Sequence, residues 1–175
     1  MVEGNSLRSI SRITGTHRTA IQRLLVKFGE GCERFMDTML RNLVLDHVQL
    51  DELWTFCGKK EGRLTKQEKR NPGLGDQYLF LALDTDTKLI ASWKLGKRTS
   101  ETTRAFIDDL ASRLHFRPEL SGQSPQLSTD GFPAYPRAIG ESFDGKVRHG
   151  VLIKRYSNPE VGRYAPPNLC DTDRY

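Results

Sequence analysis

Residues 47–56 read HVQLDELWTF, and this stretch decides the fold class. Apolar and polar residues alternate with a period of two, which is typical of a strand with one buried face. One face carries Val48, Leu50, Glu52 and Trp54, and the other carries Gln49, Asp51, Leu53 and Thr55. The pattern predicts a β-strand with an aspartate at its middle.

Alternating strand and helix signals follow this strand. Turn-forming residues separate the apolar runs, and Ser100 is a good N-cap for a helix whose apolar stripe includes Phe106 and Leu110. The elements expected are strands at Gln77–Leu83 and Lys88–Leu95, a helix from Ser100 towards Pro118, a strand at Pro125–Thr129, a short helix at Tyr135–Ile139 and a strand at Val147–Lys154. The order β-β-β-α-β-α-β predicts an α/β fold, a ribonuclease H-like mixed sheet with crossover helices.

The N-terminal residues predict a helix-turn-helix module. Two apolar sets in Ser6–Phe28 flank the turn Thr14-Gly15-Thr16, where a glycine provides the positive φ that such turns need. Thr16 is expected to cap the second helix. Residues expected to contact DNA from that helix are His17, Arg18, Gln22 and Arg23. The alternative is a helical hairpin with a solvated basic face.

Composition agrees with a protein that binds DNA. Net charge is +5, and positive residues cluster in the head and in a loop after the first strand. The loop residues expected to touch phosphates are Lys59, Lys60, Arg63, Lys66, Lys69 and Arg70. The longest strongly apolar run, 78–83, is far shorter than the ~20 residues of a membrane span, so we expect no membrane association and a cytoplasmic location.

The expected organisation has four parts. These are a helix-turn-helix module at 1–29, a linker helix at 30–46, a ribonuclease H-like core at 47–157 and a proline-rich irregular tail at 158–175.

Two aspartates are candidates for chemistry. Asp51 lies in mid-strand, where a charge is costly without a partner, and Asp130 follows the strand end QLST and precedes Gly131. Strand-borne carboxylates that converge can hold Mg²⁺, with Mn²⁺ as a substitute, and Mg²⁺ can activate a water or a 3′-hydroxyl. Spacing alone leaves an ordinary ion pair with a lysine as the alternative.

Three strings together resemble one enzyme family. QLDELWTFCGKK (49–60), DQYLFLALDTDTKLIASWKLGKRTSETTRAFIDDL (76–110) and LSTDGFPAYPRAI (127–139) are similar to the insertion-sequence-1 type of bacterial transposases, over about residues 5 to 170. The resemblance implies a DDE enzyme with a ribonuclease H-like core, and Mg²⁺-dependent cleavage and transfer of DNA strands. Asp51 matches the first catalytic aspartate and Asp130 the second.

The same resemblance implies that the third acid, a glutamate on a later helix, lies beyond residue 175. Glu160 and Asp173 are the nearby acids, and both fall in the tail. We therefore expect a truncated copy that binds double-stranded DNA, both element ends and target, but has little or no catalytic activity. The alternative function is a non-catalytic DNA-binding protein that occupies the element ends and represses transposition. Whether the chain forms a homo-oligomer stays open.

Overall fold

The computed structural model describes residues 3–116, 124–157 and 168–174, with side chains up to residue 153. The chain divides into two compact units, Met1–Arg41 and Asn42–Tyr175. Each unit is described by itself.

The first unit consists of two helices joined by a short turn. Helix α1 spans Leu7–Thr14 and is capped by the Ser6 hydroxyl, which accepts from the Ser9 N–H at 3.1 Å. Gly15 follows with a φ of 70°, which confirms the left-handed glycine expected in the turn. The cap of the second helix was wrongly predicted at Thr16, because His17 is the N-cap and its Nδ1 accepts from Thr19 N–H.

Helix α2 is longer than the sequence suggested. It runs without interruption over Arg18–Met39, through Gly29 and Gly31, so the linker helix predicted at 30–46 is not a separate element. A glycine inside a helix costs about 1 kcal/mol relative to alanine but does not end it unless the backbone turns to positive φ. Neither glycine has a positive φ, and the chain leaves the helix at Leu40 instead.

Little apolar surface is buried in this unit. Ile21 is the buried residue of α2, and no residue of α1 is buried. Ile13 and Leu24, which belong to the two expected apolar sets, are 75% and 68% exposed.

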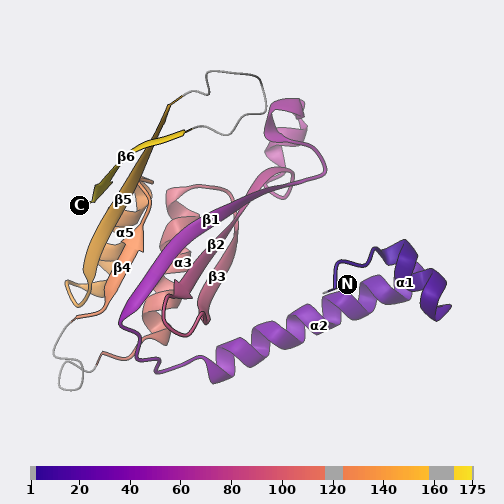
Figure 1. Cartoon of the computed structure of the whole chain (residues 1–175). Coiled ribbons are helices and arrows are strands. Elements are labelled where there is room, and N and C mark those ends of the chain that lie inside the picture. Colours follow the sequence, from indigo (N-terminus) through magenta and orange to yellow (C-terminus); the bar gives the residue numbers. More distant parts are fainter. Residues whose placement is uncertain (1–2, 117–123, 158–167, 175) are drawn as a thin grey trace. The chain divides into compact units, whose positions relative to one another are not determined.

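A mixed six-stranded sheet dominates the second unit, in the order β3-β2-β1-β4-β5-β6 (Figure 1). Strands β1, β2 and β3 pair antiparallel in sequence order, β4 lies parallel to both β1 and β5, and β6 is antiparallel to β5. The strands are β1 His47–Cys57, β2 Gly75–Asp84, β3 Ile90–Gly96, β4 Gln126–Thr129, β5 Arg148–Ser157 and β6 Asn168–Arg174. The predicted order of elements up to β5 is confirmed.

The tail predicted as irregular at 158–175 contains a strand. Asn168–Arg174 form β6, paired with β5 from Ser157↔Asn168 to Leu152↔Arg174. The three prolines of this tail led to the prediction of an irregular segment. All three lie before Asn168, outside the strand.

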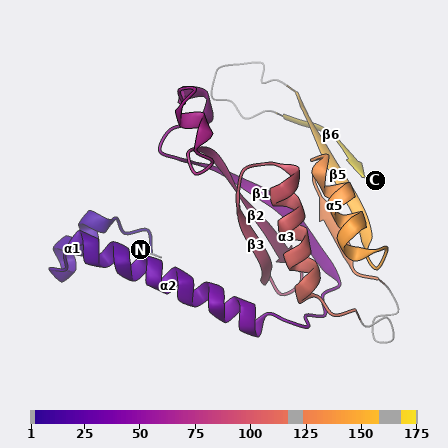
Figure 2. The ribbon, with the colours of Figure 1, turned by 180° about the vertical axis from the view of Figure 1, so that it is seen from behind.

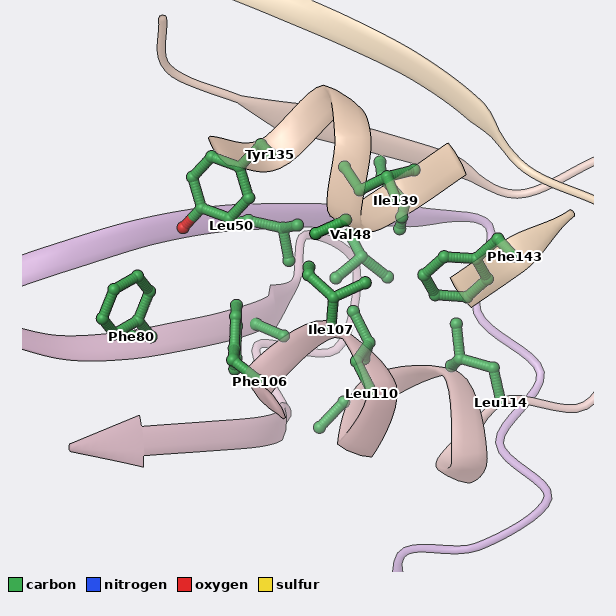
Figure 3. Close-up of a cluster of buried hydrophobic side chains, with 14 of the residues drawn as sticks. Val48, Leu50, Phe80, Phe106, Ile107, Leu110, Leu114, Tyr135, Ile139 and Phe143 are labelled. Atoms are coloured by element: carbon green, nitrogen blue, oxygen red, sulfur yellow. The ribbon is translucent and has the colours of Figure 1, made fainter. Parts of the chain in front are cut away.

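Two helices cover one face of the sheet. Helix α3, Ser100–Arg113, and helix α5, Ala134–Phe143, lie on the same side of it (Figure 2). The core forms between them and the strands (Figure 3). Its fully buried side chains include Val48, Leu50, Phe80, Phe106, Ile107, Leu110, Leu127 and Tyr135. The buried face predicted for β1 is confirmed at Val48, Leu50 and Glu52, whereas Trp54 is exposed, and the apolar stripe predicted for α3 is confirmed.

The other face of β1, β2 and β3 carries exposed apolar side chains. Leu53 pairs with Leu79 and Leu79 with Leu95, so these three share a face, and Leu53 and Leu95 are 56% and 54% exposed. Trp93 and Ile90 on β3 are also exposed. An apolar sheet face of this kind normally packs against another element. No helix of the described part has the length and the apolar character required to cross a membrane.

Candidate metal-binding and DNA-binding sites

Asp51 and Asp130 lie at the same level of two neighbouring strands. Asp51 is in β1, and Asp130 comes directly after the end of β4. The two strands are parallel and Gln49 pairs with Ser128, two residues before each aspartate. Because side chains alternate along a strand, Asp51 shares the face of Gln49, and Asp130 stands at the first position after β4.

The two aspartates line one open hollow of about 350 Å³. Backbone and side chains from β1, β4 and β5 form its walls. The residues are Gln49, Leu50, Asp51, Ser128, Thr129, Asp130, Gly131, Leu152 and Ile153. A Cβ at Gly131 would lie 3.4 Å from the Ile153 side chain, which is ordinary van der Waals contact, so these two residues are close neighbours on the wall of the hollow. The structure therefore places both aspartates that the sequence singled out on the wall of one hollow.

Each carboxylate is held by a local hydrogen bond. Asp51 Oδ1 accepts from the N–H of Glu52 at 2.8 Å. Asp130 Oδ1 accepts from the N–H of Phe132 at 2.9 Å, while Asp130 Oδ2 lies 3.3 Å from the Arg98 Nη2. A carboxylate oxygen has two acceptor positions, so these bonds leave acceptor capacity on both aspartates.

The two carboxylates fit a hard divalent ion. Mg²⁺ prefers oxygen ligands, keeps several waters and is commonly bound by one or two carboxylates together with phosphate groups of a substrate. An open hollow leaves space for those waters. Within the described residues, no group of three or more His, Cys, Asp or Glu is arranged to hold a metal ion. The two aspartates could hold an ion only together with waters or a substrate phosphate, as far as the described residues supply ligands.

Of the two other acids named for this site, neither has a side chain among those that the structure describes. Glu160 lies outside the described residues, and Asp173 lies in β6, for which only the backbone is described. Asp173 pairs with Ile153, whose side chain lines the hollow.

Sequence reasoning missed a buried acid beside the aspartates. The side chain of Glu52 is only 3% exposed, and its Oε2 forms an ion pair with Arg98 Nη2 at 3.1 Å. Burial raises the pKa of Glu52, partly offset by the Tyr135 hydroxyl and by Arg98, while the charge of Asp130 raises it further. The signal was present in the sequence, since the alternation already placed Glu52 on the core face with Val48 and Leu50.

Tyr135 stands next to this acid. Burial, followed by the neighbouring Glu52, raises the pKa of the Tyr135 phenol, and the charges of Asp130 and Asp51 add to the effect. The Tyr135 hydroxyl and Glu52 Oε1 are both buried, and neither makes a hydrogen bond of standard geometry. Figure 3 shows the hydroxyl at the end of the core cluster away from Phe143. Buried polar atoms are costly without partners, and these two groups are close enough for each to shift the pKa of the other.

The residues predicted to contact DNA from α2 are accessible. His17, Arg18, Gln22 and Arg23 are all exposed. Three of them, His17, Arg18 and Gln22, line a shallow hollow within this unit together with Leu7, Arg8 and Thr19. The surface of the first unit that is predicted to contact DNA therefore carries exposed positively charged side chains.

Not all of the predicted basic loop is free to meet a phosphate. The loop joins β1 to β2 and contains two short 3₁₀ turns, η1 Glu61–Arg63 and η2 Glu68–Arg70. Lys59 Nζ binds Glu68 Oε1 at 2.6 Å, and this contact, with Thr65, lowers the Glu68 pKa to about 2. Lys60 Nζ lies over the Trp54 ring, 5.1 Å from its centroid.

The remaining basic residues of the loop face solvent. These are Arg63, Lys66, Lys69 and Arg70.

Solved structures of two transposases are similar to the chain at low sequence identity. No protein-family model and no curated protein matches the chain. A piggyBac transposase synaptic complex with hairpin DNA is similar with a TM-score of 0.36 and 14% identity, over 71% of this chain and 27% of that one. A Mos1 transposase paired-end complex with the left transposon end is similar with a TM-score of 0.37 and 12% identity, over 84% and 54%. The chain thus spans about a quarter and about half of these two transposases.

Proposed function

We propose that the chain is a DNA-handling protein of the transposase class, in which Asp51 and Asp130 hold Mg²⁺ at the site where such enzymes cleave and transfer DNA strands, and that this chain by itself binds DNA with little or no cleavage. The observation that carries the proposal is the position of these two aspartates, which line one hollow at the same level of two parallel strands. The likeness of the strings around them to insertion-sequence-1 transposases supports the same assignment.

The proposed fold is ribonuclease H-like. Three antiparallel strands, a crossover helix and two further parallel strands occur in that order, and β1 lies centrally beside β4. We further propose that α1 and α2 act as a helix-turn-helix that binds double-stranded DNA. Its exposed His17, Arg18, Gln22 and Arg23, on a unit rich in arginine, support this assignment.

Each site residue has a defined task in this proposal. Asp51 and Asp130 supply the oxygen ligands, and the open side of the hollow admits a DNA phosphate. The chemistry that Mg²⁺ supplies when bound is activation of a water or a 3′-hydroxyl and stabilisation of the leaving oxygen. The exposed basic residues of the β1–β2 loop attract the DNA backbone.

A second function, DNA binding without cleavage, is favoured by one observation. No third acid joins the two aspartates in the part of the chain that the structure describes. A chain that binds element ends without cutting them would act as a repressor.

DNA binding in the presence of a divalent ion tests the proposal. Affinity for a DNA duplex is measured with Mg²⁺ and with EDTA, at constant ionic strength. We expect Mg²⁺ to strengthen binding, because an ion on Asp51 and Asp130 would also accept a phosphate ligand. Asp51→Asn and Asp130→Asn should each remove that gain.

Asp144→Asn is the matched control, since Asp144 is an exposed aspartate in the turn after α5. It should leave the gain from Mg²⁺ unchanged. An equal gain in the unsubstituted chain and in both site variants would rule out the carboxylate pair as the ion site.

A further inference from the structure

Arg98 lies at the junction of two acids. It follows the end of β3 and precedes Thr99, the N-cap of α3. Its guanidinium donates to Glu52 Oε2 from Nε at 3.2 Å and forms ion pairs from Nη2 with Glu52 at 3.1 Å and Asp130 at 3.3 Å. One cation therefore joins a buried acid to an acid of the proposed metal site.

Aromatic rings fix the plane of this guanidinium. Arg98 Cζ lies 4.0 Å from the centroid of the Phe132 ring and 5.9 Å from that of Tyr78. An arginine is always charged, and a planar guanidinium stacked on a ring and bound to a carboxylate has a defined orientation. A lysine cannot reproduce the stacking or the fork of donors.

Glu52 is the buried acid that holds the Arg98 guanidinium in place. Its side chain is 3% exposed, and Arg98 forms its ion pair. A buried carboxylate without its cation is strongly unfavourable, so Glu52 holds Arg98 in place more firmly than an exposed acid would.

Asp130 is the second acid that Arg98 binds, and each of its carboxylate oxygens contacts a donor. Arg98 binds its Oδ2, and the Phe132 N–H binds its Oδ1. With both oxygens held, the carboxylate plane cannot rotate freely, and the remaining acceptor positions have a set direction.

We propose that Arg98, anchored by Glu52, is the positioning residue that orients the carboxylate of Asp130 for a divalent ion. This inference rests on the proposed function, because it assigns a task to Arg98 at the same site. Partners of metal ligands commonly change metal affinity by about 10–100-fold when they are removed.

The charge of Arg98 acts in the opposite direction. A guanidinium near the site repels a second cation, so loss of Arg98 by itself favours binding of any divalent ion. The ratio of Mg²⁺ affinity to Ca²⁺ affinity separates the two effects. Mg²⁺ requires near-ideal octahedral geometry, whereas Ca²⁺ accepts irregular geometry, and both carry the same charge.

The test uses the full chain with Arg98→Ala, Arg98→Lys and Glu52→Gln. Mg²⁺ and Ca²⁺ affinities are measured by competition with Mn²⁺, and hydrogen exchange is measured at the Phe132 amide. We expect the Mg²⁺/Ca²⁺ affinity ratio to fall about tenfold or more in Arg98→Ala, with no rescue in Arg98→Lys. Hydrogen exchange at the Phe132 amide should become faster in both Arg98 variants. Glu52→Gln should likewise lower the Mg²⁺/Ca²⁺ affinity ratio and make exchange at Phe132 faster.

Arg137→Ala is the control, because Arg137 is an exposed arginine of α5, with a side chain 85% exposed and paired with Glu141. Unchanged ion ratio and unchanged Phe132 exchange in both Arg98 variants would overturn the inference. Rescue by Arg98→Lys would also overturn it, since charge alone would then suffice. Failure of the unsubstituted chain to bind ions through Asp130 would instead overturn the proposed metal site, while the Phe132 exchange would still report on the orientation of Asp130.

Discussion

Gln49 of β1 pairs with Ser128 of β4, and this register places Asp51 of β1 beside the end of β4, which Asp130 directly follows. Asp51 and Asp130 are 79 positions apart in the sequence, and strands β2 and β3 and the crossover helix α3 lie between β1 and β4. A shift of the β1–β4 register by one residue would move one aspartate to the opposite face. The candidate site is therefore a direct consequence of how these strands pair.

Replacing Arg18, Gln22 and Arg23 with alanine should abolish sequence preference in DNA binding. The three side chains are exposed at the start of α2, and each lost base contact costs about 1–3 kcal/mol. The measurement is the preference for duplexes selected from a random pool, at fixed salt. Arg34→Ala, an exposed position further along α2, should weaken binding to all duplexes without changing the preference. An unchanged preference in the triple variant would mean that another element reads the sequence.

Replacing Arg63, Lys66, Lys69 and Arg70 with alanine should flatten the salt dependence of duplex binding. Each neutralised phosphate contributes about −0.9 to the slope of log affinity against log salt, so the four changes should reduce its steepness by up to ~3.6. Lys59→Ala should have a smaller effect, because Lys59 is already paired with Glu68. A slope that stays the same would leave the loop as a solvated surface.

Stability should fall in mild acid because of His149. Burial lowers the pKa of this imidazole, whose Nε2 lies 2.9 Å from Thr129 Oγ1. Below the unfolded pKa of about 6.5 the unfolded chain binds more protons than the folded chain, so the free energy of unfolding decreases until pH reaches the lowered folded pKa. Glu52, whose pKa is raised, contributes in the opposite direction, so the comparison must be made between variants.

Urea unfolding between about pH 7.5 and 5.5 measures this effect. His149→Gln should lose less stability on acidification than the unsubstituted chain. Parallel losses in both proteins would show that the His149 imidazole does not contribute.

Purified chain should bind DNA without nicking it in Mg²⁺ or Mn²⁺. Among the described residues, Asp51 and Asp130 are the acids that line the hollow, which leaves a second ion without an anchor, and a misplacement of about 1 Å can cost on the order of a hundredfold in rate. The measurement is conversion of supercoiled plasmid to the nicked form. Robust nicking that is lost in Asp130→Asn would contradict this expectation and would place the third ligand within these 175 residues. Glu160 and Asp173 would then be substituted first.

The strands and the two aspartates could be predicted because their signals are local. The alternation in β1 identifies its buried face, and the sequence QLST before Asp130 identifies the end of β4. The continuity of α2 through Gly29 and Gly31 could not be predicted with the same rules, since glycine usually indicates a break.

The contact between Arg98 and Glu52 joins residues 46 positions apart, and it depends on β1, β2 and β3 being paired in register. No sequence pattern marks a pairing of that kind. The alternation shows only that Glu52 is a charged residue on a buried face, which identifies the need for a cation but not the residue that supplies it.

An anomalous difference map from crystals grown with MnCl₂ tests the central claim most directly. The account predicts a manganese peak in the hollow, at about 2.1 Å from a carboxylate oxygen of Asp51 and from one of Asp130, and its loss in Asp130→Asn crystals. A hollow with ordered carboxylates and no peak, or a manganese ion bound elsewhere and unaffected by Asp130→Asn, would contradict the assignment of this pair as the metal site.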